Sequence, residues 1–170
     1  MKPTIEISEE PQGATYEALL DFAAKHSERF SLVWREQMKF NPAAHQIAVT
    51  LQPYLIGESL TNSWPGTQLR GRQALVRQYR TARASLEPLR TVGSLYAWRS
   101  PNLPEDLTFY TADKVPWLIT VSHEHMAWFP ENPLTLESVQ QSIPGIILHQ
   151  QSLLKDNSAP SIRKTAPKRR

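Results

Sequence analysis

The residues best suited to chemistry lie close together between positions 92 and 130. This stretch holds two of the five histidines, His123 and His125, separated by one residue, and an adjacent acidic pair, Glu105 and Asp106, that follows two prolines. Imidazole nitrogens and carboxylate oxygens are common ligands of divalent metal ions and common groups of acid–base catalysis. Metal-dependent or acid–base chemistry in this chain is therefore expected here.

The His123-x-His125 pair predicts a metal site if the strand expected at 117–122 continues through it. Residues two apart on a strand point to the same face, so both imidazoles would reach one divalent ion. The third ligand would come from Glu105, Asp106 or His149. The alternative, which we favour because His-x-His is frequent by chance, is that the strand ends near Ser122 and the histidines occupy a half-exposed turn at the rim of the sheet.

The Glu105–Asp106 pair has a structural interpretation beside the catalytic one. Two adjacent carboxylates can bind a hard cation, or act as acid and base when their surroundings separate their pKa values. Neighbouring residues on a strand face opposite sides, however, which argues against joint work by these two side chains. The structural alternative is a pair at the start of a strand, with one carboxylate accepting backbone N–H groups of the proline-rich loop and the other carboxylate solvated.

Basic residues form two further candidate surfaces. Residues 69–87 are predicted to form an amphipathic helix with Leu75 and Tyr79 on its apolar face. Arginines project from its opposite face, and those expected to contact a phosphate or an acidic partner are Arg70, Arg77 and Arg80. The alternative is a solvated helix surface. The tail, residues 155–170, is predicted to be disordered and would strengthen association with nucleic acid.

Charge and composition limit the classes of protein this chain can belong to. The net charge is +3, of which residues 155–170 contribute +5, so residues 1–154 carry −2. The absence of cysteine excludes disulfides, thiolate catalysis and cysteine-ligated metals, and a reducing, cytoplasmic compartment is the expectation. No apolar run reaches the roughly 18 residues that span a bilayer, so membrane insertion is not expected. No glycine-rich nucleotide-binding loop is present.

Periodicity predicts an α+β fold in which residues 1–154 form one globular domain. An antiparallel β-meander over about residues 94–129 is expected to pack against amphipathic helices from both flanking regions. The predicted strands are 30–35, 54–60, 94–99, 107–111, 117–122 and 126–129. The predicted helices begin at Thr15 and Asn41, span 69–87, and follow Thr135, with a final apolar helix over 146–154. Residues 1–13 are expected to be irregular.

Three hypotheses of function follow from these observations. The first is a small non-enzymatic binding or interaction protein, without a resident cofactor, that presents the meander and its proline-rich loop to a partner, most simply another protein. The second is a metal-dependent, hydrolase-like enzyme that uses the His123-x-His125 pair. The third is a nucleic-acid-associated protein that uses the arginine-rich helix and the basic tail. The first is favoured because the chain contains no complete catalytic set.

Overall fold

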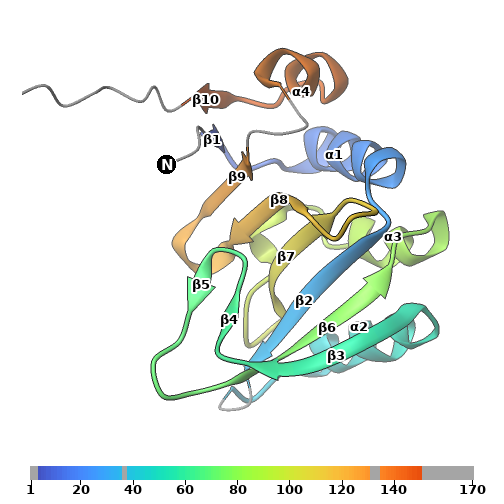
Figure 1. Ribbon diagram of the computed structural model, residues 1–170. Helices are drawn as coiled ribbons and strands as arrows, with labels where there is room; N and C mark the ends of the chain where they lie inside the picture. Colours follow the sequence, from blue (N-terminus) through green and yellow to red (C-terminus); the bar gives the residue numbers. More distant parts are fainter. Residues whose placement is uncertain (1–3, 36–37, 131–134, 151–170) are drawn as a thin grey trace, which may run out of the picture.

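An antiparallel sheet of eight strands dominates the fold (Figure 1). The computed structural model describes residues 4–35, 38–130 and 135–150. Strand order in the sheet is β10-β1-β9-β8-β7-β2-β6-β3, and β4 and β5 pair separately as a small hairpin. The strands of the large sheet are β1 (Thr4–Ile7), β2 (Arg29–Arg35), β3 (Leu55–Thr61), β6 (Ala74–Arg80), β7 (Glu105–Tyr110), β8 (Pro116–Val121), β9 (Met126–Pro130) and β10 (Leu148–Gln150). The hairpin comprises β4 (Ser63–Trp64) and β5 (Thr67–Gln68).

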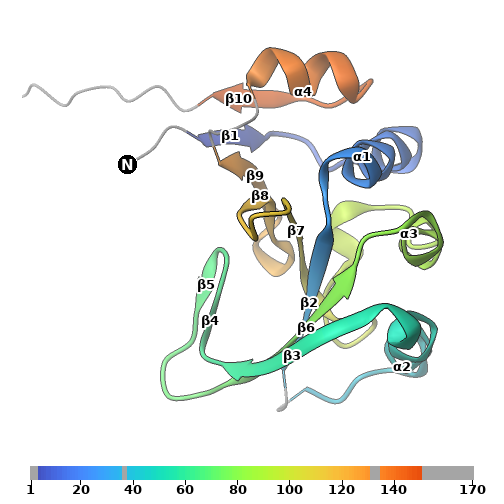
Figure 2. The same ribbon diagram turned by 45° about the vertical axis from the view of Figure 1, so that its right-hand side comes forward.

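Three helices cover one face of the large sheet, and the hairpin stands on the other side (Figures 1 and 2). The helices are α1 (Gly13–His26), α2 (Pro42–Leu51) and α3 (Arg83–Arg90), while α4 (Leu136–Ser142) lies beside β10 at one end of the molecule. Short 3-10 helices are η1 (Gln52–Tyr54), η2 (Leu95–Ala97) and η3 (Ser122–Glu124). The architecture is mixed α+β and rich in strands.

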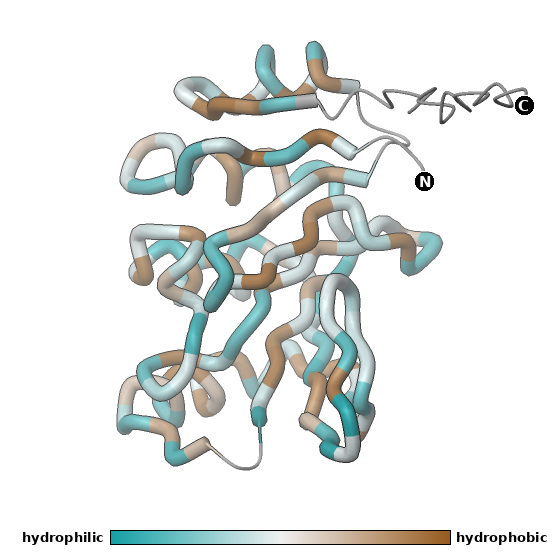
Figure 3. Tube along the Cα trace, turned by 90° about the vertical axis from the view of Figure 1, so that its left-hand side faces the viewer, coloured by the Kyte–Doolittle hydropathy of each residue, from teal (hydrophilic) through white to brown (hydrophobic). Residues whose placement is uncertain are grey.

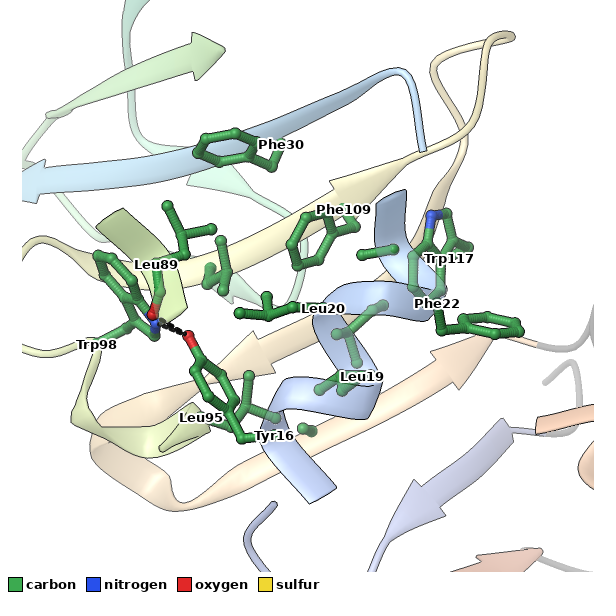
Figure 4. Close-up of a cluster of buried hydrophobic side chains, with 14 of the residues drawn as sticks. Tyr16, Leu19, Leu20, Phe22, Phe30, Leu89, Leu95, Trp98, Phe109 and Trp117 are labelled. Atoms are coloured by element: carbon green, nitrogen blue, oxygen red, sulfur yellow. Dashed lines mark hydrogen bonds between the residues drawn. The ribbon is translucent and has the colours of Figure 1, made fainter. Parts of the chain in front are cut away.

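The main core lies between the sheet and α1 (Figure 4). Tyr16, Leu19 and Leu20 of α1 are 0 % exposed, because their spacing of three and four residues places them on one face of the helix. The Trp98 indole N–H donates to the Tyr16 hydroxyl at 3.0 Å, and that hydroxyl donates to the carbonyl of Leu89 at 3.0 Å. The polar atoms of both aromatic rings are thus satisfied inside the core.

The β4–β5 hairpin packs against the opposite face of the sheet. Trp64 forms a second, smaller apolar cluster with Val33 of β2 and with residues of β6. At the tip of the hairpin, Gly66 has φ +84°, and a Cβ placed there would lie 2.8 Å from the Trp128 ring and 2.9 Å from the Val121 side chain. Only glycine allows both this backbone conformation and this close approach.

Several predicted elements are confirmed. The helices expected after Thr15 and Asn41 are α1 and α2, and the helix expected after Thr135 is α4. The strands expected at 30–35 and 54–60 are β2 and β3. Of the predicted meander, the last three strands are present as β7, β8 and β9, paired in sequence order.

Four other predictions of secondary structure are wrong. Residues 94–99 contain the 3-10 helix η2 instead of a strand, and this tight turn buries the neighbouring side chains of Leu95 and Tyr96. Residues 148–150 form β10 instead of a helix, and Thr4–Ile7 forms β1 instead of an irregular segment. The predicted helix at 69–87 is replaced by β6 and α3. Residues 151–154 and the predicted tail, 155–170, lie outside the described residues.

Within the described ranges, none of the helices has both the length and the apolar character needed to cross a membrane. Figure 3 shows the reason, since short apolar segments are interrupted by polar residues along the whole described trace.

Candidate functional site

The acidic pair at the start of β7 is buried beside the hairpin. Glu105 is 3 % exposed and Asp106 is 0 % exposed. Asp106 has φ 55°, a left-handed conformation that interrupts the alternation of a strand. The register between β2 and β7 also shifts between Ser31 and Val33. The expectation that the two carboxylates face opposite sides is therefore wrong, and their oxygens lie within 4.8 Å of each other.

Glu105 is held by one cation and one hydroxyl. Its Oε2 lies 2.6 Å from Nε of Arg35, the last residue of β2, at ion-pair distance but without the alignment of a hydrogen bond. The Ser100 hydroxyl donates to Oε1. The Arg35 guanidinium also lies 5.9 Å from the centre of the Trp64 ring, which is a cation–π contact. Burial of the Glu105 carboxylate is thus compensated by a neighbouring cation.

Asp106 joins the hairpin to the sheet. Its Oδ2 accepts the indole N–H of Trp64 at 2.8 Å, and its Oδ1 accepts the backbone N–H of Ser122 at 3.0 Å. Burial raises the pKa of Asp106, and the charge of Glu105 raises it further, whereas the Trp64 and Ser122 donors and His123 lower it. We call Arg35, Trp64, Ser100, Glu105 and Asp106 the carboxylate clamp, because they connect β2, the hairpin and β7.

The clamp has the spacing of a metal site but not its free ligand atoms. One atom each of Glu105, Asp106 and His123 lies within 4.8 Å of the others, and ligand atoms lie about 2.0–2.6 Å from a divalent ion. All four carboxylate oxygens, however, already contact a donor or a cation. A metal ion bound to Glu105 would also be repelled by the Arg35 guanidinium. The residues fit a structural clamp better than a metal centre.

The second histidine of the predicted pair points elsewhere. Strand β8 ends at Val121, residues 122–124 form η3, and His125 ends it in the left-handed conformation with φ 55°. The favoured interpretation, that the strand ends near Ser122, is therefore confirmed, and the alternative in which both histidines share a strand face is wrong. Nε2 of His125 accepts an N–H of Arg99 at 3.2 Å, and its ring stacks on Tyr96 with centroids 5.4 Å apart. His149 lies on β10, opposite Glu6, in a different part of the sheet.

The three predicted contact arginines do not share a face. Arg77 lies on β6, pairs with Glu58 at 3.2 Å, and stacks over Trp34. Arg80 is three residues further along the same strand, so the two side chains point to opposite faces. Arg70 is exposed and precedes the strand. The proposed arginine surface on a helix therefore does not form, and the hypothesis of nucleic-acid binding now depends on the tail.

A pocket of about 510 Å³ opens beside the proline-rich loop. It lies where α2, the segment after α3, η2 and the loop at 99–103 meet. Its lining residues are Ala43, Gln46, Ile47, Thr91, Val92, Ala97, Arg99, Asn102 and Leu103. These residues come from segments about 50 positions apart in sequence, so no local motif indicates the pocket. The two prolines that stiffen the loop are the only sequence signal that points toward it.

A smaller cavity of about 270 Å³ opens on the other side of α2, beside Trp34 and His45. Arg35 and Arg77 contribute to its wall, but each is already paired with a glutamate. This cavity therefore has less unpaired charge to offer a ligand than the pocket beside the loop.

Comparison of this chain with known proteins found no matching family model, no matching curated protein and no matching solved structure.

Proposed function

We propose that this chain is a non-enzymatic binding protein whose ligand occupies the pocket beside the proline-rich loop. The observation that carries the proposal is the pocket itself, with a volume of about 510 Å³ and a wall formed by the loop at 99–103. Ligand pockets in proteins commonly measure about 300–1,000 Å³ and combine apolar walls with a few polar groups. Ile47, Val92 and Leu103 supply apolar wall, and Gln46, Arg99 and Asn102 supply polar groups.

Hydrogen bonds across the pocket's rim support the idea that it is formed before a ligand arrives. The backbone N–H of Asn41 donates to the carbonyl of Pro101 at 2.8 Å. The Asn41 side-chain amide donates to the side-chain oxygen of Asn102 at 2.5 Å. The backbone N–H of Leu103 donates to the carbonyl of Arg99 at 3.1 Å. These bonds tie the start of α2 to the loop, and a wall that is already ordered lowers the entropy lost on binding.

The state of the carboxylate clamp also favours binding over catalysis. A catalytic carboxylate must reach a substrate, whereas Glu105 and Asp106 are 3 % and 0 % exposed. Each of their oxygens has a partner within the protein. A role in holding the hairpin onto the sheet accounts for all of these contacts.

One observation favours a second function, a metal-dependent enzyme. Glu105, Asp106 and His123 offer three ligand atoms within 4.8 Å of one another, and His123 is partly exposed. This candidate ranks second because the oxygens of both carboxylates already contact donors or a cation within the protein. A metal ion would have to displace these groups or bind the same oxygens beside them. Metal titration, described in the Discussion, separates the two functions.

Two substitutions on α2 test the binding proposal. Ala43→Phe places a large ring at the wall of the pocket, whereas Val49→Phe adds a ring to the same helix at a position that is 69 % exposed and outside the pocket. Saturation-transfer NMR with a mixed fragment library is the assay. We expect the wild-type protein and the Val49→Phe variant to bind the same fragments and the Ala43→Phe variant to lose them. Identical binding by all three proteins, or no binding to the wild type, would contradict the proposal.

A further inference from the structure

We infer that the ligand of this pocket is a small amphipathic carboxylate, with its apolar body against Ile47, Val92 and Leu103 and its carboxylate on Arg99. This inference rests on the proposed function and specifies its ligand. The chemical composition of the wall supplies the first argument: Arg99 is the one charged residue among those that line the pocket, and none of them is acidic. A ligand with an anionic end and an apolar body matches both parts of the wall.

The contacts of Arg99 supply the second argument. Within the described part of the chain, Arg99 makes no ion pair, whereas Arg35, Arg77 and Arg90 each pair with at least one carboxylate. Its Nη1 donates to Nε2 of His125 at 3.2 Å. A guanidinium carries five N–H donors in a planar arrangement that matches the two oxygens of a carboxylate. The remaining donors are therefore available to an anion.

The position of α2 supplies the third argument. Ala43 lies in the first turn of this helix and lines the pocket. The N-terminal end of a helix carries a partial positive charge that attracts anions. The side chain of the N-cap residue, Asn41, makes no capping hydrogen bond, and its amide N–H donates to Asn102. Arg99 and the start of α2 thus give one end of the pocket a positive potential.

A single arginine favours a monoanion over a phosphate. Phosphate groups carry more charge and are commonly held by several cations or by a glycine-rich loop. The pocket offers one cation, two amide side chains and the Thr91 hydroxyl, which already donates to the carbonyl of Pro88. A carboxylate on a chain or ring of moderate size therefore suits the wall better than a phosphorylated ligand.

Isothermal titration calorimetry with three eight-carbon probes of different charge tests the inference: octanoate, octanol and octylamine. We expect octanoate to bind the wild-type protein at least tenfold more tightly than octanol or octylamine. Arg99→Gln should weaken octanoate binding by about tenfold, the loss expected for a charge-assisted hydrogen bond at a partly solvated site. The same substitution should leave octanol binding unchanged. Arg99→Lys should recover part of the preference, and Arg80→Gln, at an exposed arginine outside the pocket, should change nothing.

The outcomes separate this inference from the proposed function. If octanol binds as tightly as octanoate and Ala43→Phe abolishes both, the pocket is a binding site but the ligand class is wrong. If Arg99→Gln leaves octanoate binding intact, the inference is also overturned. If none of the probes binds, the inference fails, and the fragment screen with the α2 variants decides separately whether the proposed function fails with it.

Discussion

Replacing Trp64 by phenylalanine tests whether the carboxylate clamp holds the hairpin to the sheet. The substitution keeps an aromatic ring in the small apolar cluster but removes the indole N–H that donates to Asp106 at 2.8 Å. Trp98→Phe is the matched control, because Trp98 is also buried and also loses one indole N–H bond, of 3.0 Å, but to the neutral hydroxyl of Tyr16. The two variants therefore differ mainly in the charge of the acceptor.

The expected magnitude follows from the energies of these bonds. A hydrogen bond to a charged group contributes about 1.5–3 kcal/mol, against about 0.5–1.5 kcal/mol for a neutral pair. The smaller phenyl ring also loses some packing. Together, these two losses should lower the free energy of unfolding of Trp64→Phe by about 2–4 kcal/mol at pH 8. This loss should exceed that of Trp98→Phe by about 1 kcal/mol.

The pH dependence gives the sharper readout. Burial raises the pKa of Asp106 above its ordinary value of 3.8, so the folded protein holds this proton more tightly than the unfolded chain. The stability that comes from this group is present below pH 3.8 and is lost as the pH rises through the raised pKa. Trp64 lowers that pKa, so Trp64→Phe raises it further and increases the loss of stability at higher pH.

Urea denaturation of both variants and the wild type at several pH values between 4 and 8 measures this effect. The destabilisation by Trp64→Phe should grow with pH, and that by Trp98→Phe should stay constant. Equal losses in the two variants, or a loss in Trp64→Phe that does not change with pH, would refute the role assigned to Asp106.

Three further predictions concern stability and metal binding. Gly66→Ala should lower the free energy of unfolding by about 3 kcal/mol, because it combines φ +84° with a contact of 2.8 Å to the Trp128 ring. Gly71→Ala, at φ +68° with nothing within 4 Å, should lower it by about 1 kcal/mol in the same urea assay. Equal losses would mean that the hairpin tip does not pack on the sheet. Tyr96→Phe should leave stability unchanged or raise it by about 1 kcal/mol, because the buried Tyr96 hydroxyl has no partner among the described residues. Tyr16→Phe should lower it by about 1–2 kcal/mol, because it breaks two bonds, and the reverse order would show that the Tyr96 hydroxyl is satisfied. Adding zinc or manganese to untagged protein, or removing metal with EDTA, should leave the melting temperature unchanged, and a rise of several degrees with metal would favour the metal-dependent enzyme over the structural clamp.

Local patterns predict much of this fold. Helix α1 and strand β9 follow the expected periods because each buries mainly one face. Strand β6 was expected to be helical because Leu75 and Tyr79, four residues apart, satisfy both a helix and a strand. The strand carries apolar residues on both faces, since the helices cover one side and the hairpin covers the other. A two-sided strand and a buried helix give similar sequence patterns.

The candidate sites were harder to predict from the sequence than the helices and strands. The sequence indicates Glu105 and Asp106 as candidate residues, but not the left-handed backbone that brings their oxygens together, nor the Trp64 donor 42 residues away. The strand end near Ser122 could be predicted, but the sequence does not indicate that η3 separates His125 from His123. The pocket depends on the tertiary packing of α2 against the loop at 99–103, and such long-range convergence leaves no periodic trace in a single sequence.

Locating a bound carboxylate by protein-observed NMR tests the central claim most directly. Titration of ¹⁵N-labelled protein with octanoate should shift the backbone amide signals of Val92, Ala97 and Leu103, which line the pocket beside the proline-rich loop. The signals of Trp34 and Leu75, which line the smaller cavity on the other side of α2, should stay in place. Shifts confined to Trp34 and Leu75 would contradict the assignment of this pocket as the binding site, and no shifts at all would contradict a carboxylate as its ligand.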